Sequence, residues 1–350
     1  MAKMRAAVML APREIEIQEV DVPVVDSDSV IIKVEGTGVC GSNLHWWRGA
    51  ERATGLWPFP IPGAGGHEYG GTVVEVGKNI RTLKVGDRVA VDQFHSTSCG
   101  QCVYCSSGAF NVCTGRGGFV TPGFVEYIKF PEKGLHVLPE SIQTHEAAII
   151  EPAATPISAL RRVGLRGGER VVVIGAGVVG LAAAGVAKAL GAGKVVVVAK
   201  YDAQEKFAYR FGADAVVRSG AADAVEQVLS QVAGGADIVV ETVGGMAPTM
   251  DMACAIVRPR GTVIPLGLWD EPVKIDSWNA VFKEITFTFA LAYGQVGLRT
   301  DYEFAIELMA TRKVPLQDLI THQVPLANIR EAFELADDKS RGAIKVVVRP

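Results

Sequence analysis

Three glycines, at positions 175, 177 and 180, restrict the possible folds of this chain more than any other feature of its sequence. The pattern Gly175-Ala-Gly-Val-Val-Gly180 follows the apolar run 170–174 and opens the apolar stretch 178–190. Such a pattern is a weak signal by itself, but between a strand and a helix it is typical of a dinucleotide-binding unit. The first glycine allows a tight turn, the second lets the backbone approach a pyrophosphate, and the third lets helix and strand pack closely. The alternative is a glycine-rich turn that binds no ligand.

The sequence around this pattern alternates between short β-branched runs and helical stretches. Such alternation predicts βαβ units and a parallel sheet. We expect strands over 170–174, 194–199, 215–218, 237–241 and 261–267, and helices over 178–190, 204–211, 222–232 and 249–257. A further helix is expected over 301–312 and a last strand over 343–348.

The first 150 residues differ, because short strands separated by glycine and proline turns dominate them. Segments 14–20 and 30–34 alternate between apolar and polar residues, while 71–77 and 86–91 are β-branched runs bounded by glycine. This pattern predicts a small, barrel-like antiparallel domain. A chain of 350 residues, 49% of them hydrophobic, accommodates two such domains, so the expected class is α/β.

Four of the six cysteines lie close together, as Cys99-x2-Cys102-x2-Cys105-x7-Cys113. Four thiolates on one short loop can complete the tetrahedral ligand set of a structural zinc ion. An iron–sulfur cluster is the main alternative, but its usual motif continues after three residues with Cys-Pro, whereas here the last gap is seven residues and Thr114 follows. Unbound thiols are the remaining alternative. We therefore expect a zinc-binding lobe over 95–116.

The charge balance excludes several kinds of partner. The chain has 35 Lys and Arg against 38 Asp and Glu, a net charge of −3, which predicts no nucleic-acid partner and no anionic membrane partner. The uncharged stretch 171–187 contains four glycines and is better explained by a strand, turn and helix than by a membrane span. The first residues soon reach charged Arg13 and Glu14, which is unlike a secretory leader, and clustered thiols favour a reducing, cytoplasmic location.

A second group of possible metal ligands is dispersed along the chain. It consists of Cys40, His67, Glu68 and Glu151, each at an expected turn or strand end. A lone cysteine or histidine more often packs in a core. A thiolate, an imidazole and two carboxylates in combination favour metal binding over core packing.

Together these residues resemble the zinc-dependent medium-chain dehydrogenase/reductase family, and in particular its polyol (sorbitol-type) and threonine dehydrogenase branch. The motifs are Cys-Gly-Ser-x-x-His, Gly-His-Glu, the four-cysteine lobe and Glu-Pro, in the expected order, together with the segment 319–326. The resemblance implies a GroES-like catalytic domain over 1–152, a Rossmann domain over 153–291 and a return to the catalytic domain over 292–350.

The resemblance also implies the roles of individual residues. A catalytic zinc ion is held by Cys40 and His67, with Glu68 or Glu151 bound directly and the other through water or only transiently. Ser42 passes the proton of the zinc-bound alcohol through the ribose hydroxyl to His45, which reaches solvent. Both residue types suit such a relay, because a hydroxyl donates and accepts and an imidazole titrates near neutral pH.

The residues after the second expected strand favour NADP(H) over NAD(H). A NAD site usually ends this strand with Asp or Glu, which binds the ribose hydroxyls, whereas this chain has Ala199-Lys200-Tyr201. Lys200 could balance the charge of a 2′-phosphate. The alternative is that Asp202 takes the ribose role. The other expected cofactor contacts are Val178, Val179, Val243, Leu266 and Gly267.

Two further features concern the properties of the metal site and the choice of substrate. The family usually has Asp after the relay residue, where it orients the zinc-bound imidazole; this chain has Asn43, which predicts a working but retuned metal site. Aromatic residues could line a substrate pocket or belong to the core, and two adjacent Trp residues suggest a flat ligand such as a ring polyol. The candidates are Trp46, Trp47, Trp57, Phe59 and Phe119.

The sequence thus predicts an enzyme with two zinc ions per chain that interconverts a secondary alcohol (a polyol, cyclitol or amino-alcohol) and its ketone by hydride transfer to NADP(H) or NAD(H). The family resemblance implies a homodimer or homotetramer. Three alternatives remain at this point. They are a zinc-free quinone or enoyl reductase, a zinc- and nicotinamide-dependent epimerase, and a non-catalytic structural or regulatory protein.

Overall fold

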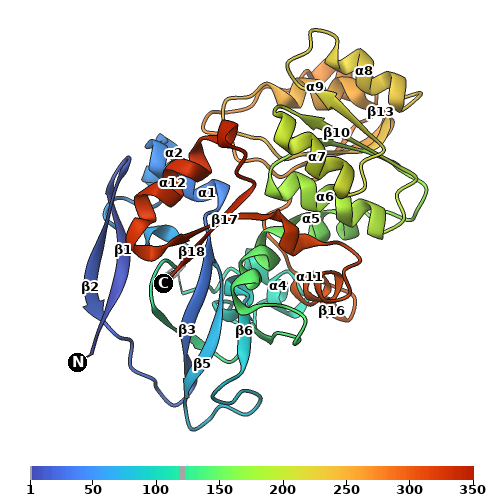
Figure 1. Ribbon diagram of the computed structural model, residues 1–350. Helices are drawn as coiled ribbons and strands as arrows, with labels where there is room; N and C mark the ends of the chain where they lie inside the picture. Colours follow the sequence, from blue (N-terminus) through green and yellow to red (C-terminus); the bar gives the residue numbers. More distant parts are fainter. Residues whose placement is uncertain (1, 118–122) are drawn as a thin grey trace. The chain divides into compact units, whose positions relative to one another are not determined.

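The computed structural model describes residues 2–117 and 123–350, and its contacts divide the chain into two compact units (Figure 1). The first unit comprises Met1–Pro152, Tyr302–Ala310 and Gln317–Pro350, and the second comprises Ala153–Asp301 and Thr311–Leu316. The pocket candidate Phe119 lies outside the described residues.

In this division the chain returns to the first unit at Tyr302, whereas the family resemblance leads us to expect a return at residue 292. Asp301 accepts hydrogen bonds from the guanidinium of Arg161, at 2.5 Å, and from the backbone N–H of Gly294, at 3.0 Å. These contacts hold the segment before residue 302 to the second unit.

Two sheets build the first unit. A three-stranded sheet has the order β2-β1-β4, and a seven-stranded sheet has the order β17-β18-β3-β5-β6-β8, with β7 also paired to β3. The strands are β1 (Lys3–Ala11), β2 (Glu14–Asp21), β3 (Ser29–Gly38), β4 (Ile61–Pro62), β5 (Glu68–Val76), β6 (Arg88–Val91), β7 (Tyr127–Pro131), β8 (Leu135–Val137), β17 (Ile320–Pro325) and β18 (Lys345–Arg349). The helices are α1 (Gly41–Arg48), α2 (Glu51–Leu56), α3 (Gln93–Ser96), α4 (Val103–Ser106), α11 (Asp301–Ala310) and α12 (Ile329–Asp337), while α5 (Ile150–Arg162) continues into the second unit.

The last strand, β18, closes the seven-stranded sheet against β3, which lies more than 300 residues earlier in the chain (Figure 1). Val347 pairs with Gly38, and the backbone N–H of Val39 donates to the carbonyl of Val346 at 2.9 Å. This pairing brings the C-terminal strand next to the segment that carries Cys40.

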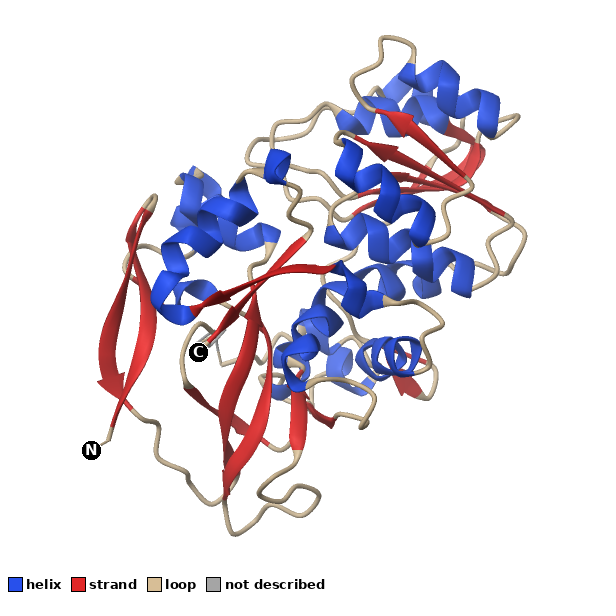
Figure 2. Cartoon of the chain, in the orientation of Figure 1, coloured by secondary structure: helices blue, strands red, loops and turns tan. Residues whose placement is uncertain are grey.

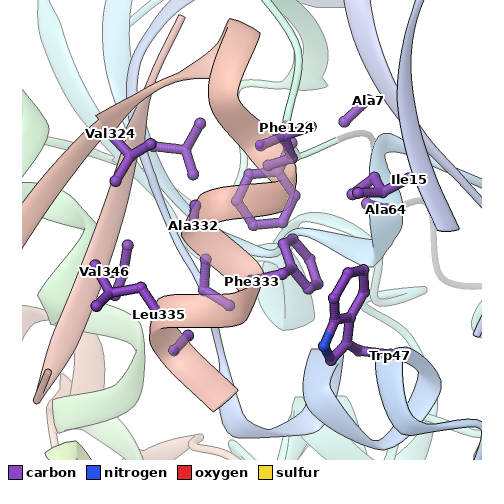
Figure 3. Close-up of a cluster of buried hydrophobic side chains, with 14 of the residues drawn as sticks. Ala7, Ile15, Trp47, Ala64, Phe124, Val324, Ala332, Phe333, Leu335 and Val346 are labelled. Carbon is purple, nitrogen blue, oxygen red and sulfur yellow. The ribbon is translucent and has the colours of Figure 1, made fainter. Parts of the chain in front are cut away.

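A core of apolar side chains surrounds α12 (Figure 3). Phe333 of this helix packs against Trp47 of α1, with ring centroids 5.4 Å apart, and against Phe124 at 5.5 Å. Trp47 is buried, so it is a core residue and not a wall of a substrate pocket.

The second unit contains a six-stranded parallel sheet with the order β11-β10-β9-β12-β13-β14 and helices on both faces (Figure 2). Its strands are β9 (Arg170–Ile174), β10 (Lys194–Ala199), β11 (Ala215–Arg218), β12 (Ala236–Glu241), β13 (Val257–Pro265) and β14 (Thr286–Phe287). Its helices are α6 (Val178–Ala189), α7 (Asp202–Arg210), α8 (Ala224–Gln231), α9 (Thr249–Ile256) and α10 (Ser277–Phe282), and a small hairpin joins β15 (Gln295–Val296) to β16 (Arg299–Thr300). The doubly wound architecture expected from the alternating pattern is therefore confirmed.

Within residues 2–117 and 123–350, no helix has both the length and the apolar composition needed to cross a membrane.

Candidate active site

The structure brings Cys40, His67 and Glu68 together in the first unit, with one potential ligand atom of each within 4.8 Å of the others. The register of two antiparallel strands explains this, because Gly38 at the end of β3 pairs with Glu68 at the start of β5. Cys40 lies two residues after the end of β3, and His67 immediately precedes β5. A side chain at position 38 would collide with Glu68, since a Cβ there would lie 2.1 Å from Oε2.

His67 is oriented for metal binding. Its Nδ1 lies 2.8 Å from the carbonyl oxygen of Gly65, so Nδ1 carries the proton and donates it to this acceptor. That tautomer leaves the lone pair of Nε2 available to a metal ion. Ser42 Oγ lies 3.3 Å from Nε2, which puts the expected relay hydroxyl beside the atom that would hold the metal. His45 follows Ser42 by three residues on α1, so the two lie on the same side of that helix.

Asn43 acts on His67 indirectly. Its Nδ2 donates to the carbonyl of Gly65 at 2.8 Å and to that of Ala64 at 3.4 Å, and its Oδ1 accepts from the backbone N–H of Cys40 at 3.0 Å. The carbonyl oxygen of Gly65 therefore accepts hydrogen bonds from both the imidazole of His67 and the amide of Asn43. The metal-site histidine is positioned by a neutral carbonyl, with Asn43 one hydrogen bond further away.

The sequence analysis missed Lys345, which forms a fully buried ion pair with Glu68. Its Nζ lies 2.5 Å from Glu68 Oε2 and 3.1 Å from the carbonyl of Val39, and neither charged side chain is exposed. The other carboxylate oxygen, Oε1, is buried and has no hydrogen-bond partner in the described residues. One signal was available, because a lysine inside the apolar run 343–348 contrasts with its neighbours.

Glu151 lies near this group but outside the compact set of three. It is the second residue of α5 and is 6% exposed. Its pKa is raised to about 8, mainly by burial and also by the neighbouring Glu68 and Cys40, while His67 and Lys345 oppose the change. Without a cation, Glu151 is therefore held mostly protonated at neutral pH.

These side chains fit a divalent cation. Burial raises the pKa of the Cys40 thiol to about 11, and the carboxylate of Glu68 adds to the effect. A bound cation would contact the unpartnered oxygen of Glu68. It would also favour the ionised forms of Cys40 and Glu151, which burial disfavours. Sulfur, imidazole nitrogen and carboxylate oxygen form a ligand set typical of zinc.

The four-cysteine lobe is also assembled. Cys99, Cys102, Cys105 and Cys113 lie within 4.8 Å of one another, and the Sγ atoms of Cys102 and Cys105 are 3.5 Å apart. No disulfide joins the cysteines of the described residues. Backbone N–H groups of Cys105 and Thr114 lower the pKa of Cys102 to about 5, whereas burial raises that of Cys105 to about 11. A shared cation would again stabilise the thiolates, so this lobe fits a tetrahedral metal ion.

The glycine-rich turn of the second unit has the geometry that each glycine was expected to provide. Gly175 has a φ of +102°, which favours glycine, and it follows β9 directly. A Cβ at Gly180 would lie 1.9 Å from the carbonyl of Gly175, whereas a Cβ at Gly177 would meet no atom within 4 Å. Gly177 therefore faces open space at the start of α6, followed by Val178 and Val179, where a pyrophosphate could approach the helix N-terminus.

The ends of β12 and β13 place the other expected cofactor contacts together. The backbone N–H groups of Leu266 and Gly267 donate to the carbonyl of Glu241, at 2.7 and 3.2 Å, and that of Val243 donates to the side chain of Glu241 at 2.8 Å. Val243 is 48% exposed. These three residues thus lie at the carboxyl edge of the sheet, the edge at which dinucleotides bind.

At the end of β10, Lys200 is exposed and its ammonium lies 5.4 Å from the centre of the Tyr201 ring. Ala199 is the last residue of the strand. Asp202, the alternative ribose acceptor, is paired with Arg218 of β11.

Two of the aromatic pocket candidates stack on each other. The rings of Trp46 and Trp57 are 5.3 Å apart and inclined by 27°. Trp46 is partly buried and its indole nitrogen has no hydrogen-bond partner in the described residues. Phe59, with Trp46, packs at the edge of the core around α12.

Comparisons with known proteins agree with this geometry. Residues 26–140 match the family model of the alcohol dehydrogenase GroES-like domain, and residues 178–311 match that of zinc-binding dehydrogenases. The chain is 33% identical to sorbitol dehydrogenase of Bacillus subtilis over 99% of this chain and 97% of that protein. It is 31% identical to D-xylulose reductase A of Aspergillus oryzae, over 92% of this chain and 90% of that protein.

Solved structures give the same picture. A protein described as a zinc-binding dehydrogenase of Sinorhizobium meliloti, solved with NADP, has a TM-score of 0.86 and 28% identity over the whole of both chains. The 2R,3R-butanediol dehydrogenase of Bacillus subtilis has a TM-score of 0.83 and 27% identity over 99% of each chain.

Proposed function

The chain belongs to the zinc-dependent medium-chain dehydrogenases, in their polyol branch, and from this premise we propose that it interconverts a polyol or related secondary alcohol and its ketone, with NADP(H) favoured over NAD(H). The observation that carries the proposal is the grouping of Cys40, His67 and Glu68 within 4.8 Å, with the imidazole already fixed in the tautomer that a metal needs. The protein is an oxidoreductase of α/β fold.

A zinc ion would be held by Cys40 and His67 together with a carboxylate, and would supply Lewis acidity toward the oxygen of the substrate, while the nicotinamide would exchange the hydride. Glu68 is close to both other ligands, but Lys345 already balances its charge. For Glu151, burial is the largest cause of the raised pKa, and His67 and Lys345 oppose it more weakly. We propose that the two carboxylates compete for the third protein-ligand position, one bound directly and the other through water or only transiently, which leaves the fourth position for the substrate.

The proton of the substrate hydroxyl would leave through Ser42 and His45. The Ser42 hydroxyl, 3.3 Å from His67 Nε2, can accept this proton while donating its own onward, because a hydroxyl has both capacities. The imidazole of His45 then delivers it to solvent. Proximity of Ser42 to the metal-binding nitrogen supports the first of these two steps.

Two cofactor assignments go with this function. The first is NADP(H), supported by Ala199 and Lys200 at the end of β10 and by the structural relative that binds NADP. The second is a structural zinc ion at the four-cysteine lobe, supported by its clustered thiols. We also propose that the first unit is the catalytic domain and the second the cofactor domain, working in the reducing cytoplasm that free thiol ligands require.

An exposed apolar face on the second unit supports a homodimer or homotetramer. Trp278 and Phe282 of α10 stack on each other, and their exposed fractions are 74% and 77%. Exposed apolar patches of this kind usually mark protein interfaces.

The substrate is tested by a screen at the nicotinamide absorbance band with polyols, cyclitols, amino-alcohols and ketones, each with NADP and NAD. We expect steady turnover of cofactor with a polyol or its ketone and a clear preference for NADP. Product epimers without net cofactor turnover would instead indicate an epimerase. Metal analysis in parallel should give two zinc ions per chain, and a content near zero would contradict the proposed chemistry.

A further inference from the structure

Strands β10 and β11 end side by side, which places a cation of the second strand next to the end of the first. Ala199 and Arg218 are partners in the parallel register, and the backbone N–H of Ser219 donates to the carbonyl of Ala199 at 3.0 Å. Both strands run in the same direction, so Arg218 and Lys200 reach the same carboxyl edge of the sheet. A ribose bound at the end of β10 would therefore lie between these two cations.

The guanidinium of Arg218 is held in place from one side. Its Nη2 contacts the carboxylates of Asp202 and Glu205, the latter at 3.2 Å, and both acids belong to the first turn of α7. No contact engages Nη1 or Nε among the described residues. The planar group is thus fixed by two acids while the donors on its remaining edge stay available.

The same contacts affect whether Asp202 can accept hydrogen bonds from a bound ribose. It is the first carboxylate after β10, and would be the natural acceptor for ribose hydroxyls in a NAD site. Its Oδ1 is instead bonded to Arg218, with the side chain 93% exposed. This contact engages an oxygen that a ribose hydroxyl would use, so Asp202 serves here as a partner of Arg218.

We propose that Arg218 is a second binding residue for the 2′-phosphate of NADP(H), acting with Lys200, and that Asp202 and Glu205 orient its guanidinium. This inference rests on the proposed preference for NADP(H). Arginine suits the task because its planar fork gives two parallel hydrogen bonds to a phosphate, while Lys200 adds a mobile point charge. The 2′-phosphate would thus be bound from two neighbouring strands.

The test compares Arg218→Ala and Lys200→Ala with Lys194→Ala, a control at the opposite, amino end of β10. Binding of NADPH and NADH is followed by nicotinamide fluorescence, and binding of 2′-phospho-ADP-ribose and ADP-ribose by calorimetry. We expect Arg218→Ala to weaken the two 2′-phosphorylated ligands at least tenfold and the two others less than twofold. Lys194→Ala should leave the binding of all four ligands unchanged. Arg218→Gln, which keeps donors for Asp202 and Glu205, gives the same comparison if the alanine variant does not fold.

Equal losses for phosphorylated and unphosphorylated ligands would overturn the proposal, because they would mean that Arg218 only maintains the edge of the sheet. No loss at all would overturn it too. Asp202→Asn should leave NADH binding within twofold of the unaltered protein, and a tenfold loss would assign the ribose to Asp202 instead. The unaltered protein's own preference is a separate readout: tighter NADH binding there would contradict the proposed cofactor, whereas the variant ratios would still test Arg218.

Discussion

Asn43 uses both ends of its buried amide, and this distinguishes it from the aspartate that the family resemblance leads one to expect. Nδ2 donates to the carbonyls of Gly65 and Ala64, which a carboxylate cannot do. The position is 1% exposed, so a charge introduced there would face two carbonyl oxygens without solvent.

We therefore predict that Asn43→Asp weakens zinc binding 10- to 100-fold, the range typical of residues that orient metal ligands. The reason is that the carbonyl holding His67 loses a donor and gains a repelling neighbour. Competition with a chromogenic chelator measures the affinity, and the pH–rate profile should shift with it. Unchanged or tighter zinc binding would contradict this account of Asn43.

Lys345 and Glu68 balance each other inside the first unit. Lys345→Met leaves the Glu68 carboxylate buried without its counter-charge, and removal of one partner of such a pair costs about 3–5 kcal/mol. We expect a loss of this size in the free energy of unfolding of the metal-free protein, measured in urea. The double variant Lys345→Met/Glu68→Gln should be more stable than Lys345→Met alone, and an equal or lower stability would refute the coupling.

At the scale of elements, substitutions at two glycines of the turn between β9 and α6 are predicted to have different effects. Gly180→Ala forces a Cβ to within 1.9 Å of the Gly175 carbonyl and should destabilise or unfold the second unit. Gly177→Ala meets no protein atom, so the fold should persist while dinucleotide binding weakens at least tenfold. Circular dichroism and dinucleotide titration separate the two outcomes, and intact binding by Gly177→Ala would contradict the expected pyrophosphate approach.

The main helices and strands of the second unit could be predicted closely, because each strand is a short β-branched run and each helix has its own apolar pattern. Expected strands such as 194–199 and 215–218 coincide with β10 and β11, and the valines of β10 are buried on both faces of the sheet. The two-residue strand β14 and the short helix α10 were not expected, since their sequences carry too few periods to be recognised.

In the first unit, the candidate ligands could be selected from the sequence, but the order of the strands in the sheet could not. Cys40, His67 and Glu68 stand out by residue type, and the structure groups them. The pairing of β18 with β3 joins residues far apart in sequence, and no local pattern encodes such a contact. Lys345 was missed for this reason: Glu68 lies on β5, and the ion pair becomes evident only once β18 and β5 are known to flank β3.

At the scale of the whole molecule, Glu151 makes stability depend on pH when metal is absent. Its pKa of about 8 in the folded chain exceeds the ordinary 4.5, so between these values the folded state binds more protons than the unfolded state. The free energy of unfolding should therefore fall as pH rises through this window, by at most about 1.4 kcal/mol per pH unit.

Urea unfolding of the zinc-free protein at pH 5, 6, 7 and 8 measures this slope. Glu151→Gln cannot ionise and should flatten it, and added zinc should reverse the trend because its ligands bind as anions. A slope unaffected by the glutamine variant would show that other groups cause it.

The exposed aromatic pair of α10 predicts how copies of the chain associate. Replacing Trp278 by Glu places a charge at the centre of an apolar surface, which should dissociate the oligomer while each copy keeps its fold. Light scattering after size exclusion measures the mass, and circular dichroism serves as the folding control. An unchanged oligomer would place the interface elsewhere.

The union of β3 with β18 also sets an order for biosynthesis. The sulfur, the imidazole and both carboxylates are translated before residue 152, but the ammonium that neutralises Glu68 follows only after the entire second unit. Glu68 therefore lacks its counter-charge in a growing chain until β18 has been made and pairs with β3, so the complete group of charged side chains can form only at the end of synthesis.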